Sequence, residues 1–183
     1  MKATLLVTCG ASLLSNAARS NLEITKKYIE PLLKAEIGSL EYDKAKDYAS
    51  KGHEVFKELL NYLRTNGSKA SAEINTIEEF LRAKNLTYRD IKFYLYRSDT
   101  SVGLLIANIL EEYLKENEAN VEIVEVKGFG TVKTLNEFQE GMVDLMTKII
   151  RVTKHIKHDK GNVYIIATGG FKPETTAAVI AAL

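Results

Sequence analysis

The chain has 183 residues, of which 45% are hydrophobic and 27% are charged, the balance of a globular protein. That length suits one domain covering residues 1–183. The 25 basic and 24 acidic residues leave a net charge of +1, so the basic surplus that usually accompanies binding of long DNA or RNA is absent.

The sequence also argues against a membrane location. It contains no run of about 18 apolar residues, the length that a membrane-spanning helix needs. The N-terminal ATLLV is better explained as a buried strand than as the core of a signal peptide. Cys9 is the only cysteine, so no internal disulfide can form, and we expect a buried structural thiol in the reducing cytoplasm.

The first half of the chain is predicted to be mostly helical. Residues 3–7 form a short apolar strand, and helices are expected over 21–35, 43–64 and 76–84. Thr76 is the expected N-cap of the third helix, with Glu79 completing a capping box. The long helical stretch 21–84 suggests either an insertion over one edge of a sheet or a dimerisation element.

From residue 90 onward, strands and helices alternate. Strands are predicted over 91–96, 121–126 and 162–167, and helices over 101–115, over 134–157 and from Pro173. The basic tract 151–160 is the expected solvated end of the second of these helices. The pattern predicts a Rossmann-like α/β fold: an open parallel sheet with helices on both faces and a helical insertion after the first strand.

Four loops follow the four predicted strands, and in a parallel sheet all four lie on the carboxyl edge, where ligands bind. Each combines Gly, Ser or Thr with a helix start, and three carry a cation, a composition that favours an anionic ligand such as a compact nucleotide. The loops are 8–12 (TCGAS), 97–103 (RSDTSVG), 127–133 (KGFGTVK) and 168–175 (TGGFKPET).

Several familiar sites are missing from the sequence. It has neither GxxxxGK[ST] nor GxGxxG after the first strand, so a P-loop NTPase and a dinucleotide-binding enzyme are not expected. His53, His155 and His158 are scattered, without the spacing of a zinc site. We therefore expect no metal and no cofactor.

The segment ATGGFKPET, residues 167–175, resembles the CARF domain, the CRISPR-associated Rossmann fold. The similarity is greatest to the branch that contains the archaeal ring nucleases and the sensor halves of CARF–HEPN ribonucleases. The first loop, TCGASLLSN at 8–16, and the segments 71–73 (SAE) and 140–141 (EG) are similar to the same family. The resemblance covers essentially the whole chain.

The resemblance implies a homodimer that binds cyclic tetra-adenylate across its twofold axis. In ring nucleases of this group a ribose 2′-OH attacks the adjacent phosphate without a metal, giving linear products with a 2′,3′-cyclic phosphate. Carried onto this chain, the resemblance makes Ser12 and Lys172 the expected catalytic residues. The expected ligand-binding residues are Gly10, Ala11, Arg97, Thr100, Gly128, Phe129, Gly130, Thr168, Gly169 and Gly170.

Two other functions fit the same pocket. One is a non-catalytic cyclic oligoadenylate sensor that regulates an effector such as a HEPN ribonuclease, and the other is a domain binding another mononucleotide. Family members usually continue beyond the position of Leu183, so we expect either a compact form or a chain that lacks a C-terminal domain.

Overall fold

A parallel sheet of four strands forms the centre of the protein. The computed structural model describes residues 2–20, 22–128, 135–158 and 162–168. The strands are β1 (Ala3–Thr8), β2 (Ile91–Ser98), β3 (Asn120–Val126) and β4 (Val163–Ile166), in the order β3-β2-β1-β4, with every neighbouring pair parallel. The Rossmann-like α/β fold expected from the alternating elements is confirmed.

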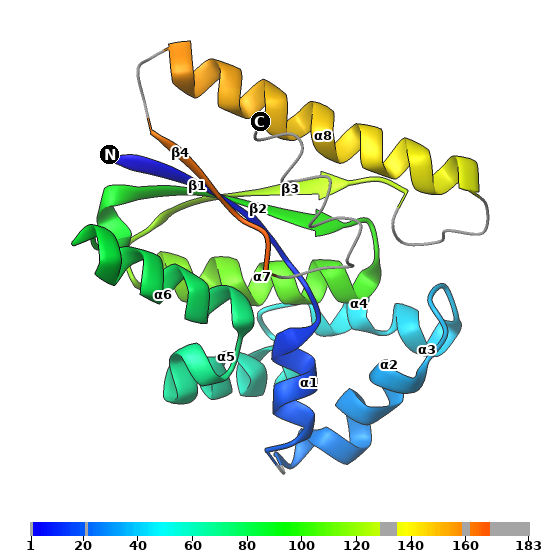
Figure 1. The fold of residues 1–183 in the computed structure, drawn as a ribbon. Coiled ribbons are helices and arrows are strands. Elements are labelled where there is room, and N and C mark those ends of the chain that lie inside the picture. Colours follow the sequence, from blue (N-terminus) through cyan, green and yellow to red (C-terminus); the bar gives the residue numbers. More distant parts are fainter. Residues whose placement is uncertain (1, 21, 129–134, 159–161, 169–183) are drawn as a thin grey trace.

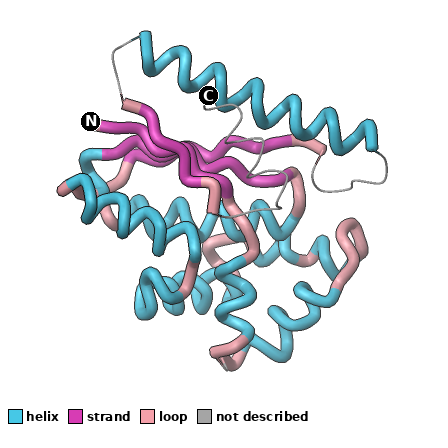
Figure 2. The backbone as a smooth tube through the Cα atoms, viewed as in Figure 1, coloured by secondary structure: helices cyan, strands magenta, loops and turns pink. Residues whose placement is uncertain are grey.

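Helices cover both faces of the sheet (Figures 1 and 2). The long helix α8 (Leu135–His158) lies on one face, where Leu145 and Ile149 pack against β-strand residues such as Leu6 and Tyr94. Helices α1 (Ser12–Ala18), α5 (Glu54–Asn66), α6 (Ala72–Lys84) and α7 (Ser101–Glu116) lie on the other face. Alternate strand residues therefore supply two hydrophobic cores.

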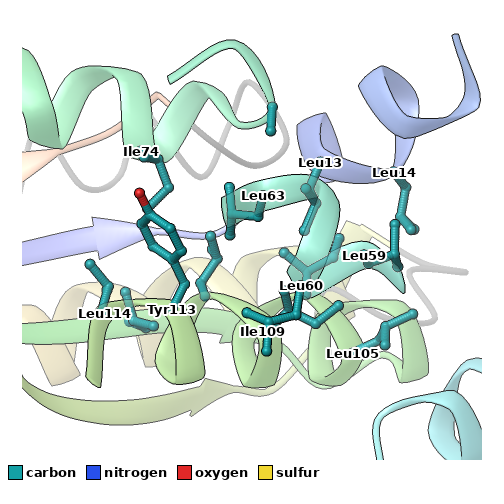
Figure 3. Packing of buried hydrophobic residues seen from close by; sticks show 14 of the residues in the cluster. Leu13, Leu14, Leu59, Leu60, Leu63, Ile74, Leu105, Ile109, Tyr113 and Leu114 are labelled. Carbon is teal, nitrogen blue, oxygen red and sulfur yellow. The ribbon is translucent and has the colours of Figure 1, made fainter. Parts of the chain in front are cut away.

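The larger core lies between the sheet and a double layer of helices. Helix α7 packs on the sheet, and α5 packs on α7 (Figure 3). The side chains that meet there are fully or almost fully buried, among them Leu13, Leu14, Leu59, Leu63, Ile74, Leu105, Ile109 and Leu114. This packing explains why the apolar spacing of the predicted helices matches their buried faces.

The predicted helical insertion is present, but as short pieces. Between α1 and α6 lie a π-helical turn η1 (Thr25–Ile29), α2 (Glu30–Lys34), α3 (Leu40–Asp43), α4 (Ala45–Tyr48), α5 and a 3-10 turn η2 (Gly67–Lys69). A second 3-10 turn, η3 (Tyr88–Asp90), precedes β2. Most of the insertion packs beneath α7 rather than over the sheet edge. It approaches that edge through α3, where Ser101 Oγ donates to Asp43 Oδ1 at 2.9 Å.

Three helix predictions need correction. The helix expected over 43–64 breaks between Tyr48 and Glu54, because His53 caps a new helix by accepting the Val55 N–H through Nδ1 at 3.2 Å. The helix expected over 21–35 is divided between η1 and α2. Residues 12–16, the second half of the segment 8–16 assigned to the first loop, form the start of helix α1.

The third predicted helix begins earlier than expected. Helix α6 starts at Ala72, and its N-cap is Ser71, whose Oγ accepts the Ile74 N–H at 3.4 Å. Thr76 lies inside the helix and donates its hydroxyl to Ala72 O at 3.1 Å. The capping box predicted for Thr76 and Glu79 is therefore wrong, because Ser71, which directly precedes the helix, caps its first turn.

Candidate functional site

The carboxyl edge of the sheet is where the predicted loops converge. The chain runs outward from β1 through β2 to β3 and then returns to place β4 on the other side of β1. Val7 pairs with Ile166, so the loop after β1 begins beside Ala167 and Thr168. The strand order reverses between β1 and β4, the position at which open α/β sheets bind ligands.

Gly10, Ala11 and Ser12 lie on the β1 side of this position, and Thr168 lies on the β4 side. Ala11 and Thr168 are exposed, and Gly10 and Ser12 are partly exposed. The β1–β4 register thus puts Thr168 beside the start of the loop that carries the other three predicted residues. The predicted residues Phe129, Gly130, Gly169, Gly170 and Lys172, and the helix expected from Pro173, lie outside the described residues.

A buried carboxylate holds the first loop in position. Glu73, in the first turn of α6, is 0% exposed. Its Oε1 accepts the Gly10 N–H at 2.7 Å, and its Oε2 accepts the hydroxyls of Ser12 at 2.7 Å and Ser71 at 2.6 Å. Ser12 Oγ in turn accepts the Ala72 N–H at 3.0 Å. Three donors make burial of this carboxyl group affordable, since an unpaired buried charge is very costly.

This network changes the expectation for the first loop. Gly10 N–H, predicted to bind a ligand, already donates to Glu73. The Ser12 hydroxyl keeps one free lone pair, because its proton and its other lone pair are engaged. The residue that organises the loop, Glu73, was not singled out as a site residue from the sequence. Its only signal was the segment 71–73, which carries part of the family resemblance.

The second loop is ordered by a helix cap. Thr100 Oγ1 accepts the Gly103 N–H of α7 at 2.9 Å and lies 2.8 Å from Ser98 Oγ. Tyr42, on α3, also hydrogen-bonds to Thr100. Burial raises the pKa of the Tyr42 phenol, and the hydrogen bond with Thr100 partly opposes this increase. Thr100 was predicted to bind a ligand. In the structure its side chain caps helix α7 at the carboxyl edge, a common role for a threonine directly before a helix.

Arg97 lies at the end of β2 but is directed toward the edge strand. Its guanidinium forms an ion pair with Glu125, the residue opposite it on β3, and Nη1 donates to Ser98 O at 2.8 Å. The side chain is 12% exposed, and its buried Nε has no hydrogen-bond partner among the described residues. The structure therefore places Arg97 on the β3 side of β2, not beside the β1–β4 position.

The third loop starts with a turn packed against α8. Gly128 has φ +91°, and a Cβ there would lie 3.0 Å from the Cα of Gly141. Its N–H donates to Asp99 Oδ2 at 3.0 Å, and the Lys127 N–H donates to Asp144 Oδ2 at 2.9 Å. Gly128 was predicted to bind a ligand. Its positive φ, a backbone conformation that other residues rarely adopt, is a structural reason for glycine at this position.

Cys9 and His155 lie in different parts of the fold, at the end of β1 and near the end of α8. Cys9 is half-buried rather than fully buried, and its N–H donates to Tyr96 O at 2.8 Å, which extends the β1–β2 pairing. His155 is exposed near the end of α8, as expected. Within the described ranges, no three His, Cys, Asp or Glu side chains are grouped so that they could hold a metal ion. No helix in the same ranges is long and apolar enough to cross a membrane.

The strand order and the helices on both faces define a Rossmann-like α/β protein, with a reversal of strand order between β1 and β4. A family model described as CRISPR-associated protein (Cas_APE2256) matches residues 68–183, more than half of the chain. The chain belongs to this CRISPR-associated family. The match begins just before α6 and includes Glu73, Arg97, Thr100 and the segment 168–172, whereas β1 and the first loop precede it.

Proposed function

We propose that this CRISPR-associated protein is a ring nuclease that binds cyclic tetra-adenylate and cleaves it without a metal ion, ending a type III CRISPR signal. The observation that carries the proposal is the reversal of strand order between β1 and β4. It places the loop containing Ser12 beside Thr168, the first residue of the TGGFK segment. Membership of a CRISPR-associated family makes a nucleotide of CRISPR signalling the natural ligand class.

The chemistry requires little beyond positioning. A ribose 2′-OH attacks the neighbouring phosphorus, the 5′-oxygen leaves, and a 2′,3′-cyclic phosphate forms, so the substrate supplies its own nucleophile. The protein must hold the three atoms in line and stabilise the charge that grows on the phosphate. In this proposal Ser12 orients the ribose or phosphate, and Lys172 neutralises the phosphate and protonates the leaving oxygen.

The proposed active unit is a homodimer. A ring of four identical nucleotides presents the same groups twice, so a ligand on a twofold axis can be bound by the same loops of two subunits. The β1–β4 position of each subunit would then supply half of the site. Size-exclusion chromatography with light scattering, with and without the ligand, tests this part of the proposal directly.

One observation favours the alternative, a sensor that binds the ring without cutting it. The Gly10 N–H and the Ser12 proton are both engaged by Glu73, which leaves fewer donors for the charge of a transition state. A sensor needs affinity but not this stabilisation. Binding and cleavage therefore have to be measured separately.

The deciding experiment incubates the purified protein with radiolabelled cyclic tetra-adenylate in EDTA and follows both complex formation and linear product. The ring nuclease gives product with a 2′,3′-cyclic phosphate, and a Lys172→Ala variant is expected to cut on the order of 100-fold more slowly, as for loss of one charge-stabilising group. Tight binding without product identifies the sensor. Absence of binding rejects both functions and leaves another mononucleotide as the ligand.

A further inference from the structure

The hydrogen bonds of Glu73 determine what the Ser12 hydroxyl can do for a ligand. A serine hydroxyl has one proton and two lone pairs. The proton points to Glu73 Oε2 at 2.7 Å, and one lone pair accepts the Ala72 N–H at 3.0 Å. One lone pair of the Ser12 hydroxyl remains available. This hydroxyl can therefore accept a hydrogen bond from a ligand but cannot donate one.

The same carboxylate also engages the loop backbone. Glu73 Oε1 takes the Gly10 N–H at 2.7 Å, which removes that amide from the donors available to an anion. These contacts connect residues 61 and 63 positions apart in the sequence. One fully buried side chain on α6 thus fixes both the shape and the hydrogen-bonding polarity of the first loop.

We infer that Glu73 is the positioning residue of this site, because its carboxylate presents Ser12 as an acceptor toward a ligand hydroxyl. The inference rests on the proposed function and concerns the same site. An acceptor at Ser12 suits a ribose 2′-OH, which donates its proton in the hydrogen bond, and does not suit a phosphate oxygen, which is itself only an acceptor. Holding the 2′-OH in this way leaves the lone pairs of its oxygen free to face the phosphorus.

The substitution Glu73→Gln reverses the direction of the hydrogen bond between residue 73 and Ser12 while keeping the size and shape of the side chain. In Glu73→Gln, the amide oxygen can still accept the Gly10 N–H, and the amide nitrogen can donate to the hydroxyls of Ser12 and Ser71. Ser12 Oγ then accepts two hydrogen bonds, and its proton is directed to the ligand. A 2′-OH that receives a hydrogen bond on its oxygen is a poorer nucleophile, so binding and cleavage should separate.

The test is a double-mutant cycle in single-turnover cleavage and in binding of cyclic tetra-adenylate, using Glu73→Gln, Ser12→Ala and the double variant. Each single variant is expected to cleave at least tenfold more slowly, with affinity within about threefold of wild type. The double variant is expected to be no slower than the slower single variant, because Glu73 acts through Ser12. Glu79→Gln, an exposed carboxylate on the same helix, is the control and should behave as wild type.

Several outcomes would overturn the inference. A folded Glu73→Gln protein that cleaves at the wild-type rate, or losses that multiply in the double variant, would show that Glu73 does not act through Ser12. If Glu73→Gln does not fold, Glu73→Asp replaces it in the cycle. The shorter side chain keeps the charge but withdraws from Ser12, and the same non-additive loss is expected.

Failure of the proposed function has a different signature. A wild-type protein that neither binds nor cleaves cyclic tetra-adenylate rejects the ligand itself, before any variant is compared. A wild-type protein that binds without cleaving rejects the nuclease function, and it also overturns the inference, because Ser12 would then have no attacking 2′-OH to orient.

Discussion

Tyr96 shows how one buried atom can cost stability. Its ring is 3% exposed on β2, and its phenol oxygen has no hydrogen-bond partner among the described residues. Burial is also the main reason that the pKa of Tyr96 is raised far above its ordinary value. An unpaired buried hydroxyl loses its hydrogen bonds to water and gains none in the protein, which destabilises the folded state.

We therefore predict that Tyr96→Phe raises the free energy of unfolding by about 1 kcal/mol, because it removes the unpaired oxygen and keeps the ring. Urea denaturation monitored by circular dichroism measures this change. The control is Tyr28→Phe, which removes an exposed hydroxyl that donates to Glu54 and is expected to change stability by less than about 0.5 kcal/mol. Destabilisation by Tyr96→Phe would contradict the prediction.

Whether the role of a residue can be predicted from the sequence depends on how far along the chain its contact partners lie. The positions of Gly10 and Ser12 beside a sheet edge follow from local signals, a strand followed by glycine and serine. Glu73 reaches them only through the folded chain, from more than 60 residues away. No local pattern distinguishes such a glutamate from the ordinary acidic residue of a helix's first turn.

Among the elements, the junction of β2 and α7 depends on a close approach at Gly103. A Cβ at this position would lie 2.5 Å from Ser98 Oγ and 2.8 Å from the Ser98 carbonyl oxygen. Alanine is intrinsically the better helix former, by about 1 kcal/mol. The backbone contact outweighs that preference, because the strand and the helix would have to separate.

Gly103→Ala is accordingly predicted to lower the free energy of unfolding by about 2 kcal/mol, a typical cost of overpacking. Thermal or urea unfolding measures the effect. Gly52→Ala provides the matched control, since its new Cβ would have its nearest contact at 3.8 Å, with Ser50 Oγ. An equal or smaller loss for Gly103→Ala than for Gly52→Ala would mean that the junction adjusts freely.

The strands and the long helices were predictable because each has a continuous apolar run or an apolar face at helical spacing along its whole length. All four strands and helices α7 and α8 match the expected ranges to within two residues. The short helices of the insertion were not predictable from the sequence. Helices α3 and α4 have only four residues each and depend on packing against α7 rather than on their own helix propensity. Caps such as His53 and Ser71 then decide where the short pieces begin.

At the scale of the whole molecule, the strand order gives the position of the proposed ligand site. Cys9 follows β1 directly, next to the β1–β4 reversal, and is half-buried. It is also the only cysteine in the chain, so a thiol reagent reports on this single position. Reaction of Cys9 therefore measures occupancy of the proposed site without altering any residue assigned to the ligand.

We predict that saturating cyclic tetra-adenylate slows alkylation of Cys9 by iodoacetamide at least tenfold, because the ligand covers the loop that follows β1. Mass spectrometry of samples quenched over time gives the rate, measured at times short compared with any cleavage. Inorganic phosphate at the same concentration is the control and should leave the rate unchanged. If the ring binds, as measured independently, and the Cys9 rate does not change, the ligand lies away from the β1–β4 reversal. The strand order would then no longer locate the site.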